Sequence, residues 1–115
     1  AFAALFTPDG TLIRPGAAPL QGQAAIIAAY RDRPADRLTR HLVCNTLFDE
    51  VSQDAAAATS SVLLWVGLAS DAEGVYGRPV HRQVMGEFAD HFALTSQGWR
   101  IARRAARFLL VSETG

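Results

Sequence analysis

A histidine and an aspartate on separate predicted strands are the residues best suited to transfer protons. His41 lies in a run rich in aliphatic and β-branched residues, and Asp90 lies between Phe88 and Phe92. An imidazole titrates close to neutral pH, and a carboxyl among apolar side chains is easier to protonate unless donors or a cation hold its charge. If the strands bring the two together, they would form an acid–base dyad in which Asp90 orients the imidazole.

Both residues also have a purely structural interpretation. A lone histidine on an apolar face is commonly a core residue, and Asp90 could pair with an arginine of a neighbouring strand, Arg103 or Arg107. Asn45, on the predicted face of His41, could hydrogen-bond a substrate oxygen or could satisfy backbone or water. The pattern of residues leaves these alternatives open.

The strand that carries His41 is predicted to run from Arg37 to Val51. It follows Pro34 and ends before the turn-forming residues 52–54. Because side chains alternate between the faces of a strand, residues two apart share a face. One face is predicted to carry Thr39, His41, Val43, Asn45 and Leu47, and the other Leu38, Arg40, Leu42, Cys44, Thr46 and Phe48. Polar groups among the apolar residues of the first face indicate a pocket lining.

The remaining elements follow from periodicity and turn residues. Helical segments are predicted at 1–6 and 22–33, a turn at 7–10, and strands at 11–14, 55–69, 81–94 and 99–111. Helices followed by a meander of long strands indicate an α+β fold. We expect a single domain over residues 1–115, with helices packed on the concave face of a strongly curved antiparallel sheet, around a pocket.

Composition excludes several classes of partner. The chain has 115 residues, half of them hydrophobic, and a formal net charge of zero, so it has no electrostatic footprint for nucleic acid or an anionic membrane. Its single cysteine cannot form an internal disulfide, and Cys44 and the three histidines lack zinc-ligand spacing. No transmembrane run or signal peptide is recognisable. We expect a cytoplasmic protein that uses neither metal nor cofactor.

Four short motifs in a fixed order resemble a known family. They are Leu-Phe-Thr-Pro-Asp-Gly-Thr-Leu at 5–12, Gly-Gln-Ala-Ala-Ile at 22–26, Thr-Arg-His at 39–41 and Gly-Trp-Arg-Ile at 98–101. Together they resemble the SnoaL-like branch of the nuclear transport factor 2-like superfamily. The resemblance implies a cone-shaped fold with a pocket between helix and sheet. It does not fix the reaction, because the superfamily includes dehydratases, isomerases, polyketide cyclases and non-catalytic binding or accessory subunits.

The resemblance also implies roles for individual residues. His41 matches the strand histidine that serves as acid–base residue in the dehydratase members, and Asp90 falls where ketosteroid isomerases place a protonated aspartate. Arg14 stands where those isomerases carry their general base, which argues against that isomerase mechanism. The family also has one or two helices ahead of the position of Ala1, so the N-terminal helix is expected to be incomplete.

These observations favour a cofactor-independent acid–base enzyme acting on a hydrophobic cyclic small molecule, with dehydration as the preferred reaction. The alternatives are an isomerase or polyketide cyclase of the same fold, and a non-catalytic binding protein or accessory subunit. Besides His41 and Asp90, the residues predicted to bind substrate are Arg14, Tyr30, Val43, Asn45, Trp65, Phe88 and Phe92.

A homodimer is expected because one face of the sheet needs a cover. The even-numbered face of the predicted strand carries Leu42, Cys44 and Phe48, and so short a chain has too few helices to cover both faces of a long sheet. Two copies packed sheet to sheet would bury these side chains.

Overall fold

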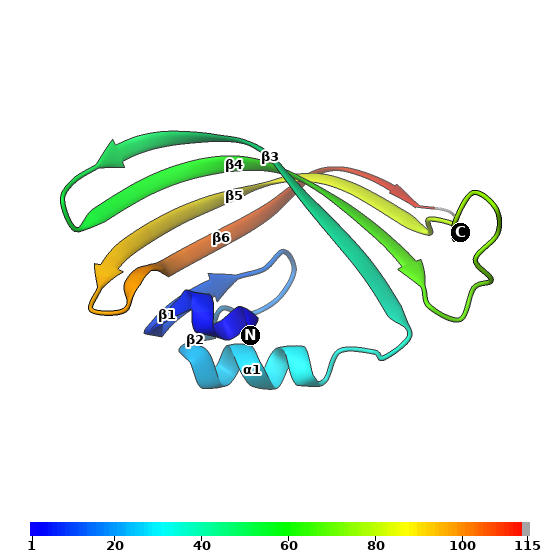
Figure 1. Ribbon diagram of the computed structural model, residues 1–115, viewed down its shortest axis with the longest axis horizontal. Coiled ribbons are helices and arrows are strands. Elements are labelled where there is room, and N and C mark those ends of the chain that lie inside the picture. Colours follow the sequence, from blue (N-terminus) through cyan, green and yellow to red (C-terminus); the bar gives the residue numbers. More distant parts are fainter. Residues whose placement is uncertain (114–115) are drawn as a thin grey trace.

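The computed structural model describes residues 1–113 and shows an open, curved sheet above a single α-helix (Figure 1). The elements are a 3₁₀-helix η1 (Phe2–Leu5), β1 (Phe6–Ile13), β2 (Leu20–Gln21), α1 (Gln23–Arg31), β3 (Arg37–Val51), β4 (Ala55–Leu68), β5 (Arg82–Thr95) and β6 (Gly98–Glu113). The strand order is β2-β1-β6-β5-β4-β3, with β1 and β6 parallel and all other neighbours antiparallel. The predicted α+β class with a strongly curved sheet is confirmed, although the sheet is mixed and does not close.

The first residues of the chain differ from the prediction. Residues 1–6 were expected to end a helix and 7–10 to form a turn, but β1 runs through Asp9 and Gly10 as one strand. An irregularity in the pairing with β6, between Phe6 and Thr11, accommodates this pair. Glycine at position 10 eases this close approach, since a Cβ would lie 3.1 Å from the carbonyl oxygen of Ile101. The predicted turn is therefore wrong. Asp9 and Gly10, a pair that commonly forms turns, instead lie within β1 at the point where its pairing with β6 shifts register.

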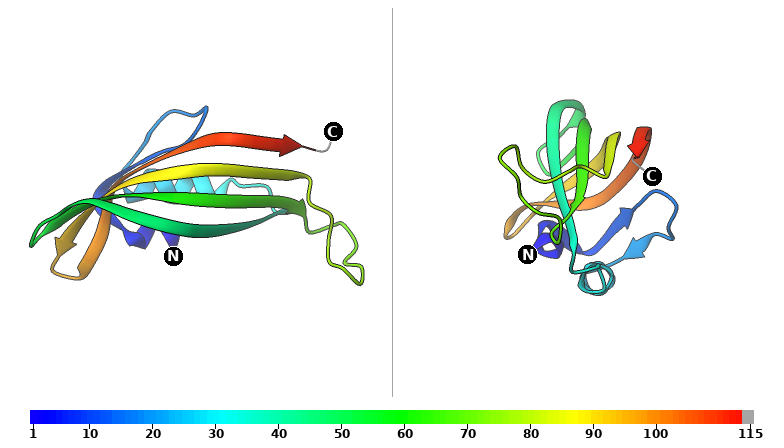
Figure 2. Two further views of the ribbon diagram at one scale, coloured as in Figure 1. Left: turned by 90° about the horizontal axis from the view of Figure 1, so that it is seen from above. Right: turned by 90° about the vertical axis from the view of Figure 1, so that its right-hand side faces the viewer.

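The hydrophobic core lies where α1, η1, β1 and β6 meet. Ile26 of α1 is fully buried, and it packs with Phe6 and Leu12 of β1 and Ile101 of β6. The side-chain amide of Gln23 donates a hydrogen bond to the carbonyl oxygen of Phe6 at 2.8 Å, which ties the start of α1 to β1. The helix thus lies beneath the β1–β2 end of the sheet (Figures 1 and 2). No helix within residues 1–113 is long and apolar enough to cross a membrane.

The two faces of the sheet follow from the pairing register, because residues paired directly across strands share a face. We call the face that packs on α1 the concave face, and the other the convex face. Leu12 of the core pairs with Arg104, which pairs with Asp90, so both charged residues belong to the concave face. His41 pairs with Leu64 and Leu64 with Val84, and these three also lie on the concave face.

A β-bulge in β3 changes which residues share the face of His41. Val43 pairs with Val62, but Thr46 pairs with Ser60, so β3 uses one residue more than β4 over this stretch. Alternation is therefore reset after Val43, and the predicted division of the strand is wrong from there on. Thr46 and Phe48 lie on the concave face, whereas Asn45 and Leu47 lie on the convex face.

A second bulge, in β6, brings two backbones unusually close. Met85 pairs with Leu110 but Gly86 pairs with Phe108, which leaves one extra residue in β6. At this point a Cβ on Gly86 would lie 2.4 Å from the carbonyl oxygen of Arg107, closer than two unbonded atoms can approach. Glycine is therefore needed for the bend that the long strands make here.

We predict that Gly86→Ala destabilises the fold by about 1–3 kcal/mol, because the added methyl group must displace backbone atoms of β6. The measurement is urea unfolding followed by circular dichroism. Gly74→Ala is the matched control, since its added Cβ would meet nothing closer than 3.9 Å. Equal unfolding midpoints for the two variants would show that the close approach is not a constraint.

Candidate functional site

His41 lies on the concave face of β3 with its ring accessible. No side chain within residues 1–113 hydrogen-bonds its imidazole, and the residue is exposed. Partial burial lowers the pKa of His41, and the positive charges of Arg33, Arg104 and Arg37 lower it further. The imidazole is therefore held in its neutral form, which can accept a proton.

Two of these arginines lie at the junction of α1 and β3. Arg33 follows the end of α1 and donates a hydrogen bond to the hydroxyl of Thr39. Arg37, Thr39 and His41 alternate on the concave face, so neighbouring members are about 7 Å apart along the strand. The pKa of Arg37 is lowered by partial burial and by the charges of Arg33 and Arg82. The helix end and the strand start together surround the imidazole with guanidinium groups.

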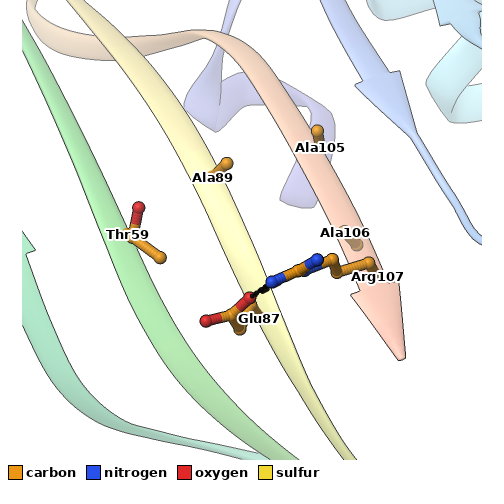
Figure 3. A pocket seen from close by; sticks show the side chains of 6 residues that line it. All are labelled: Thr59, Glu87, Ala89, Ala105, Ala106 and Arg107. Carbon is orange, nitrogen blue, oxygen red and sulfur yellow. Dashed lines mark hydrogen bonds and ion pairs between the residues drawn. The ribbon is translucent and has the colours of Figure 1, made fainter. Parts of the chain in front are cut away.

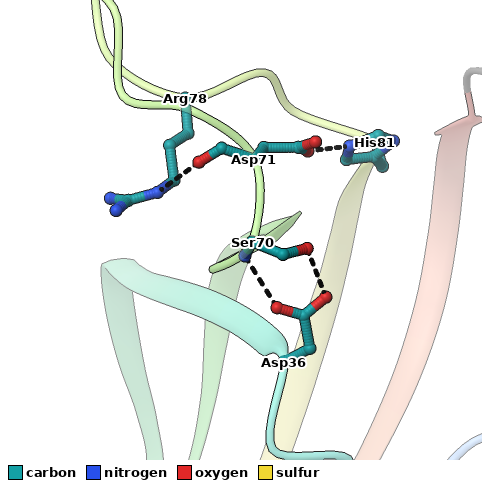
Figure 4. A network of polar contacts seen from close by, with 5 residues as sticks. All are labelled: Asp36, Ser70, Asp71, Arg78 and His81. Carbon is teal, nitrogen blue, oxygen red and sulfur yellow. Dashed lines mark hydrogen bonds and ion pairs between the residues drawn. The ribbon is translucent and has the colours of Figure 1, made fainter.

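A polar network in the loops fixes the start of β3 (Figure 4). The carboxylate of Asp36 accepts hydrogen bonds from the backbone N–H and the hydroxyl of Ser70, each at 2.7 Å. The carboxylate of Asp71 contacts the ring of His81 at 2.5 Å, and the Asp71 carbonyl oxygen accepts from Arg78 at 3.0 Å. The bonds of Asp36 join the residue before Arg37 to the loop that follows β4, and those of Asp71 hold that loop together.

Asp90 forms a buried ion pair with Arg104. Only 3% of Asp90 is exposed, and its two oxygens accept hydrogen bonds from Nε and Nη2 of Arg104 at 2.8 and 3.0 Å. The guanidinium also lies over the ring of Phe88, 4.2 Å from its centre. The expectation that Asp90 could pair with an arginine of a neighbouring strand is therefore confirmed. The expected partners, Arg103 and Arg107, are wrong. Arg103 pairs across from His91 on the convex face, and Arg107 binds Glu87 there.

The structure does not form the predicted His41–Asp90 dyad. His41 pairs with Leu64 of β4, and Leu64 pairs with Val84 of β5. Asp90 lies six residues further along β5 than Val84. Both oxygens of Asp90 are already occupied by Arg104. Arg104 takes the intermediate position instead: it holds Asp90, extends over Phe88 towards the row of His41, and lowers the pKa of His41. Asp90 thus acts on the imidazole only by positioning a cation.

The other predicted residues divide between the two faces. Val43, Phe88 and Phe92 lie on the concave face, as predicted. Asn45 is directed to the convex face by the bulge, so its predicted place beside His41 is wrong. Trp65 pairs with Gln83 and is next to Leu64 in the chain, which places Trp65 on the convex face as well. It is therefore not a wall of a pocket that contains His41.

Tyr30 lies on α1 and Arg14 at the end of β1, and both were predicted to bind substrate. Tyr30 lies on α1 with its ring centre 5.0 Å from that of Phe2, and it interacts electrostatically with Arg37. Arg14 follows the last residue of β1 and has the parity of Leu12, a concave residue. Its Nε is buried and has no hydrogen-bond partner within residues 1–113. A buried donor without a partner is costly, so this unpaired N–H is an unsatisfied group at the edge of the concave face.

An apolar hollow of about 440 Å³ occupies the other end of the concave face. It is lined by Phe48, Val51, Ala56, Phe92 and Trp99. Sequence reasoning placed Phe48 on the other face, because the bulge after Val43 that brings it to this one was not predicted. The concave face therefore runs from a basic end at His41, through the Asp90–Arg104 pair, to an apolar end.

A second hollow, of about 330 Å³, lies on the convex face (Figure 3). Its floor is made of small residues, Thr59, Ala89 and Ala105, and the Glu87–Arg107 ion pair borders it at 2.7 Å. None of the predicted site residues lines it. Within residues 1–113, no three His, Cys, Asp or Glu side chains are grouped as a metal ion would require.

The curved sheet over one helix, with titratable groups on its concave face, defines an α+β protein of the nuclear transport factor 2-like superfamily. A model of the SnoaL-like domain matches residues 1–105. The chain therefore belongs to the SnoaL-like family, and the predicted resemblance is confirmed. No curated protein matches it.

Solved structures show the same fold at low sequence identity. A scytalone dehydratase-like protein of Novosphingobium aromaticivorans is 22% identical, with a TM-score of 0.78 over 98% of this chain and 72% of that one. A hexachlorocyclohexane dehydrochlorinase (LinA) type 2 is 14% identical, with a TM-score of 0.79 over 98% and 73%. ActVI-ORFA of Streptomyces coelicolor is 22% identical, with a TM-score of 0.70 over 93% and 79%. These likenesses establish the fold alone.

We predict that His41 titrates below the ordinary histidine value of about 6.5, and that Arg37→Gln raises its pKa because one of the nearby positive charges is removed. The measurement is an NMR titration of the His41 ring resonances. Arg40→Gln is the control: Arg40 precedes His41 in the chain but pairs with Trp65 on the convex face. A wild-type pKa at or above 6.5, or equal effects of the two substitutions, would contradict the prediction.

Proposed function

We propose that this protein is a cofactor-independent acid–base enzyme that dehydrates a hydrophobic cyclic small molecule, with His41 as the catalytic base. One observation carries the proposal: an accessible imidazole, without a hydrogen-bond partner in residues 1–113, lies on the concave face, where partial burial and three arginines lower its pKa. A base must be unprotonated and within reach of substrate to act at neutral pH. The cytoplasmic location expected from the sequence stays a prediction.

The apolar part of the concave face suits a cyclic substrate. Val43, in the same strand as His41, is about half exposed, and Phe108 and Val111 of β6 are also accessible on this face. Aliphatic and aromatic side chains next to a few polar groups are typical of small-molecule sites. A ring packed on these residues would bring its polar substituents to the basic end.

The proposed reaction is the loss of water from a β-hydroxyketone. His41 removes a proton from the carbon next to the carbonyl, and the electron pair of that C–H bond moves to form an enolate. As the enolate collapses, a carbon–carbon double bond forms, the C–O bond to the hydroxyl breaks, and the imidazolium returns its proton so that water leaves. Negative charge on the carbonyl oxygen develops towards the guanidinium groups and is stabilised there.

We predict that His41→Ala lowers the rate of dehydration about 10²–10⁴-fold, the usual contribution of a positioned general base. The measurement uses a panel of cyclic β-hydroxyketones, with water loss followed by the absorbance of the conjugated enone. Deuterium exchange at the carbon next to the carbonyl is followed by NMR. His91→Ala is the control, since His91 pairs with Ala57 on the convex face. Activity of His41→Ala equal to that of the control would refute the proposal.

The ion pair of Asp90 bears on the alternatives. A ketosteroid-isomerase role needs a protonated aspartate that donates a hydrogen bond, but both oxygens of Asp90 accept from Arg104. Isomerisation or cyclisation could still use His41, because each begins with the same proton removal. The closed pair instead favours, as a second candidate, a non-catalytic binding protein or accessory subunit. Such a protein would bind cyclic ligands without any deuterium exchange.

We further propose that the protein is a homodimer packed through its convex faces. Leu42, Leu63, Met85 and Leu110 pair in register and form one apolar row across β3 to β6. Leu110 is 67% exposed, and Leu42 and Met85 are also accessible. Phe48, which was expected on this face, belongs to the concave side. A continuous apolar row on the middle of a sheet is best buried by a second copy of the same surface.

We predict that the protein has twice the mass of one chain at micromolar concentration and that Leu110→Glu halves it, because a charge would be buried at the interface. The measurement is light scattering coupled to size-exclusion chromatography. Leu5→Glu serves as the control, since Leu5 is also exposed but lies in η1, away from the row. A wild-type protein that elutes with the mass of one chain would exclude the homodimer.

A further inference from the structure

The concave face carries more positive than negative charge. Its basic residues from the strands and their ends are Arg14, Arg37, Arg82 and Arg104, together with His41, and Arg33 joins them through Thr39. Its acidic residues in the described part of the chain are Asp90 and Glu113. The chain as a whole is neutral, so this excess is local to one face.

Only part of this charge is matched. Asp90 is bound by Arg104, and Glu113 by Arg82 at 2.9 Å. No carboxylate among residues 1–113 forms a salt bridge with Arg14, Arg33 or Arg37. Arg33 and Arg37 both act on His41 and lower its pKa. Arg14, at the end of β1, has a buried Nε without a hydrogen-bond partner in the described residues.

Such an arrangement has an electrostatic cost that a ligand can offset. Like charges at short range repel, and the repulsion is stronger where burial reduces screening by water. The lowered pKa of Arg37 reflects both burial and the neighbouring charges of Arg33 and Arg82. An anion bound between these side chains would relieve the repulsion and give their N–H groups acceptors. Guanidinium groups bind carboxylates through paired, charge-assisted hydrogen bonds.

We propose that the substrate is a carboxylic acid whose carboxylate is bound by Arg33 and Arg37 at the basic end of the concave face, beside His41. This inference rests on the proposed function, and it adds the chemical class of the substrate. The ring of the molecule lies on the apolar part of the face, towards Val43 and Phe108. The carboxylate anchors one end, so that the carbon next to the carbonyl is presented to the imidazole.

The positions of the two arginines fit this role. Arg37 and His41 are four residues apart on one face of β3, about 13 Å of strand. A guanidinium extends several ångströms from its backbone, so the anchor and the base are separated by roughly the width of one or two rings. Arg33 is held in place by the hydroxyl of Thr39, midway between them. Its remaining guanidinium N–H groups form no hydrogen bond with any residue between 1 and 113, so an anion could accept from them.

The test compares two probes of the same shape, 1-naphthoate and neutral 1-naphthamide, by calorimetry with the 115-residue chain. We expect the carboxylate to bind on the order of tenfold or more tightly than the amide, as charge-assisted hydrogen bonds allow. Arg37→Gln and Arg33→Gln should each remove most of this preference. Arg40→Gln, on the opposite face of the same strand, should leave it unchanged. Saturating 1-naphthoate should also raise the pKa of His41, because it adds a negative charge nearby.

Equal affinity for the two probes would overturn the inference, and so would a preference for the carboxylate that survives both Arg33→Gln and Arg37→Gln. Failure of both probes to bind at millimolar concentration would also overturn it. Circular dichroism of each variant checks that the fold is kept. Since binding needs no turnover, an inactive protein that still prefers the carboxylate would refute only the proposed dehydration. A protein that catalyses dehydration but does not prefer the carboxylate probe would refute only the proposed carboxylate site.

Discussion

The bending of the long strands is the constraint on which the rest of the structure depends. A straight strand of fifteen residues, the length of β3, would span about 50 Å, far beyond the reach of one short helix. Single extra residues in β3 and β6 allow the curvature. Each extra residue also resets which side chains share a face. The curvature of the sheet and the composition of its concave face are therefore set by the same residues.

The Asp90–Arg104 pair shows how a charge is kept inside this curved sheet. A carboxylate that is 3% exposed is costly unless its lone pairs are satisfied, and the two-point contact with Arg104 satisfies both oxygens. The aromatic face of Phe88 supports the guanidinium from one side. Because the pair is fixed, Arg104 cannot move away from the concave face. From this position its charge lowers the pKa of His41, in addition to the larger effect of burial.

The sequence predicts the long strands well and the site only in part. A run of aliphatic and β-branched residues between turn-forming residues defined β3 at both ends, and His41 is on the predicted face. A bulge at Cys44 and Asn45 carries no glycine or proline to announce it, so the positions of Asn45 and Phe48 could not be predicted. The choice of Arg104 over Arg103 depends on the register of two strands beside another shift, at His91 and Phe92. Arg37 is the first residue of β3 and lies on the same face as His41. It was not predicted as a site residue, because an arginine at the start of a strand is ordinarily solvated.

The positive charges have two opposing effects on the proposed chemistry. Added to partial burial, they lower the pKa of His41 and so favour its neutral form, but a lower pKa also makes the imidazole a weaker base. Proton removal next to a carbonyl is favoured only if the same charges stabilise the enolate more than they weaken the base. In the proposed reaction an enolate would bear a full negative charge on the concave face, whereas the imidazolium would share its charge with solvent because His41 is exposed. The proposed reaction therefore requires that charge stabilisation in the partly desolvated site exceed the loss of basicity, and a carboxylate anchored at Arg37 would reduce that loss by raising the pKa of His41.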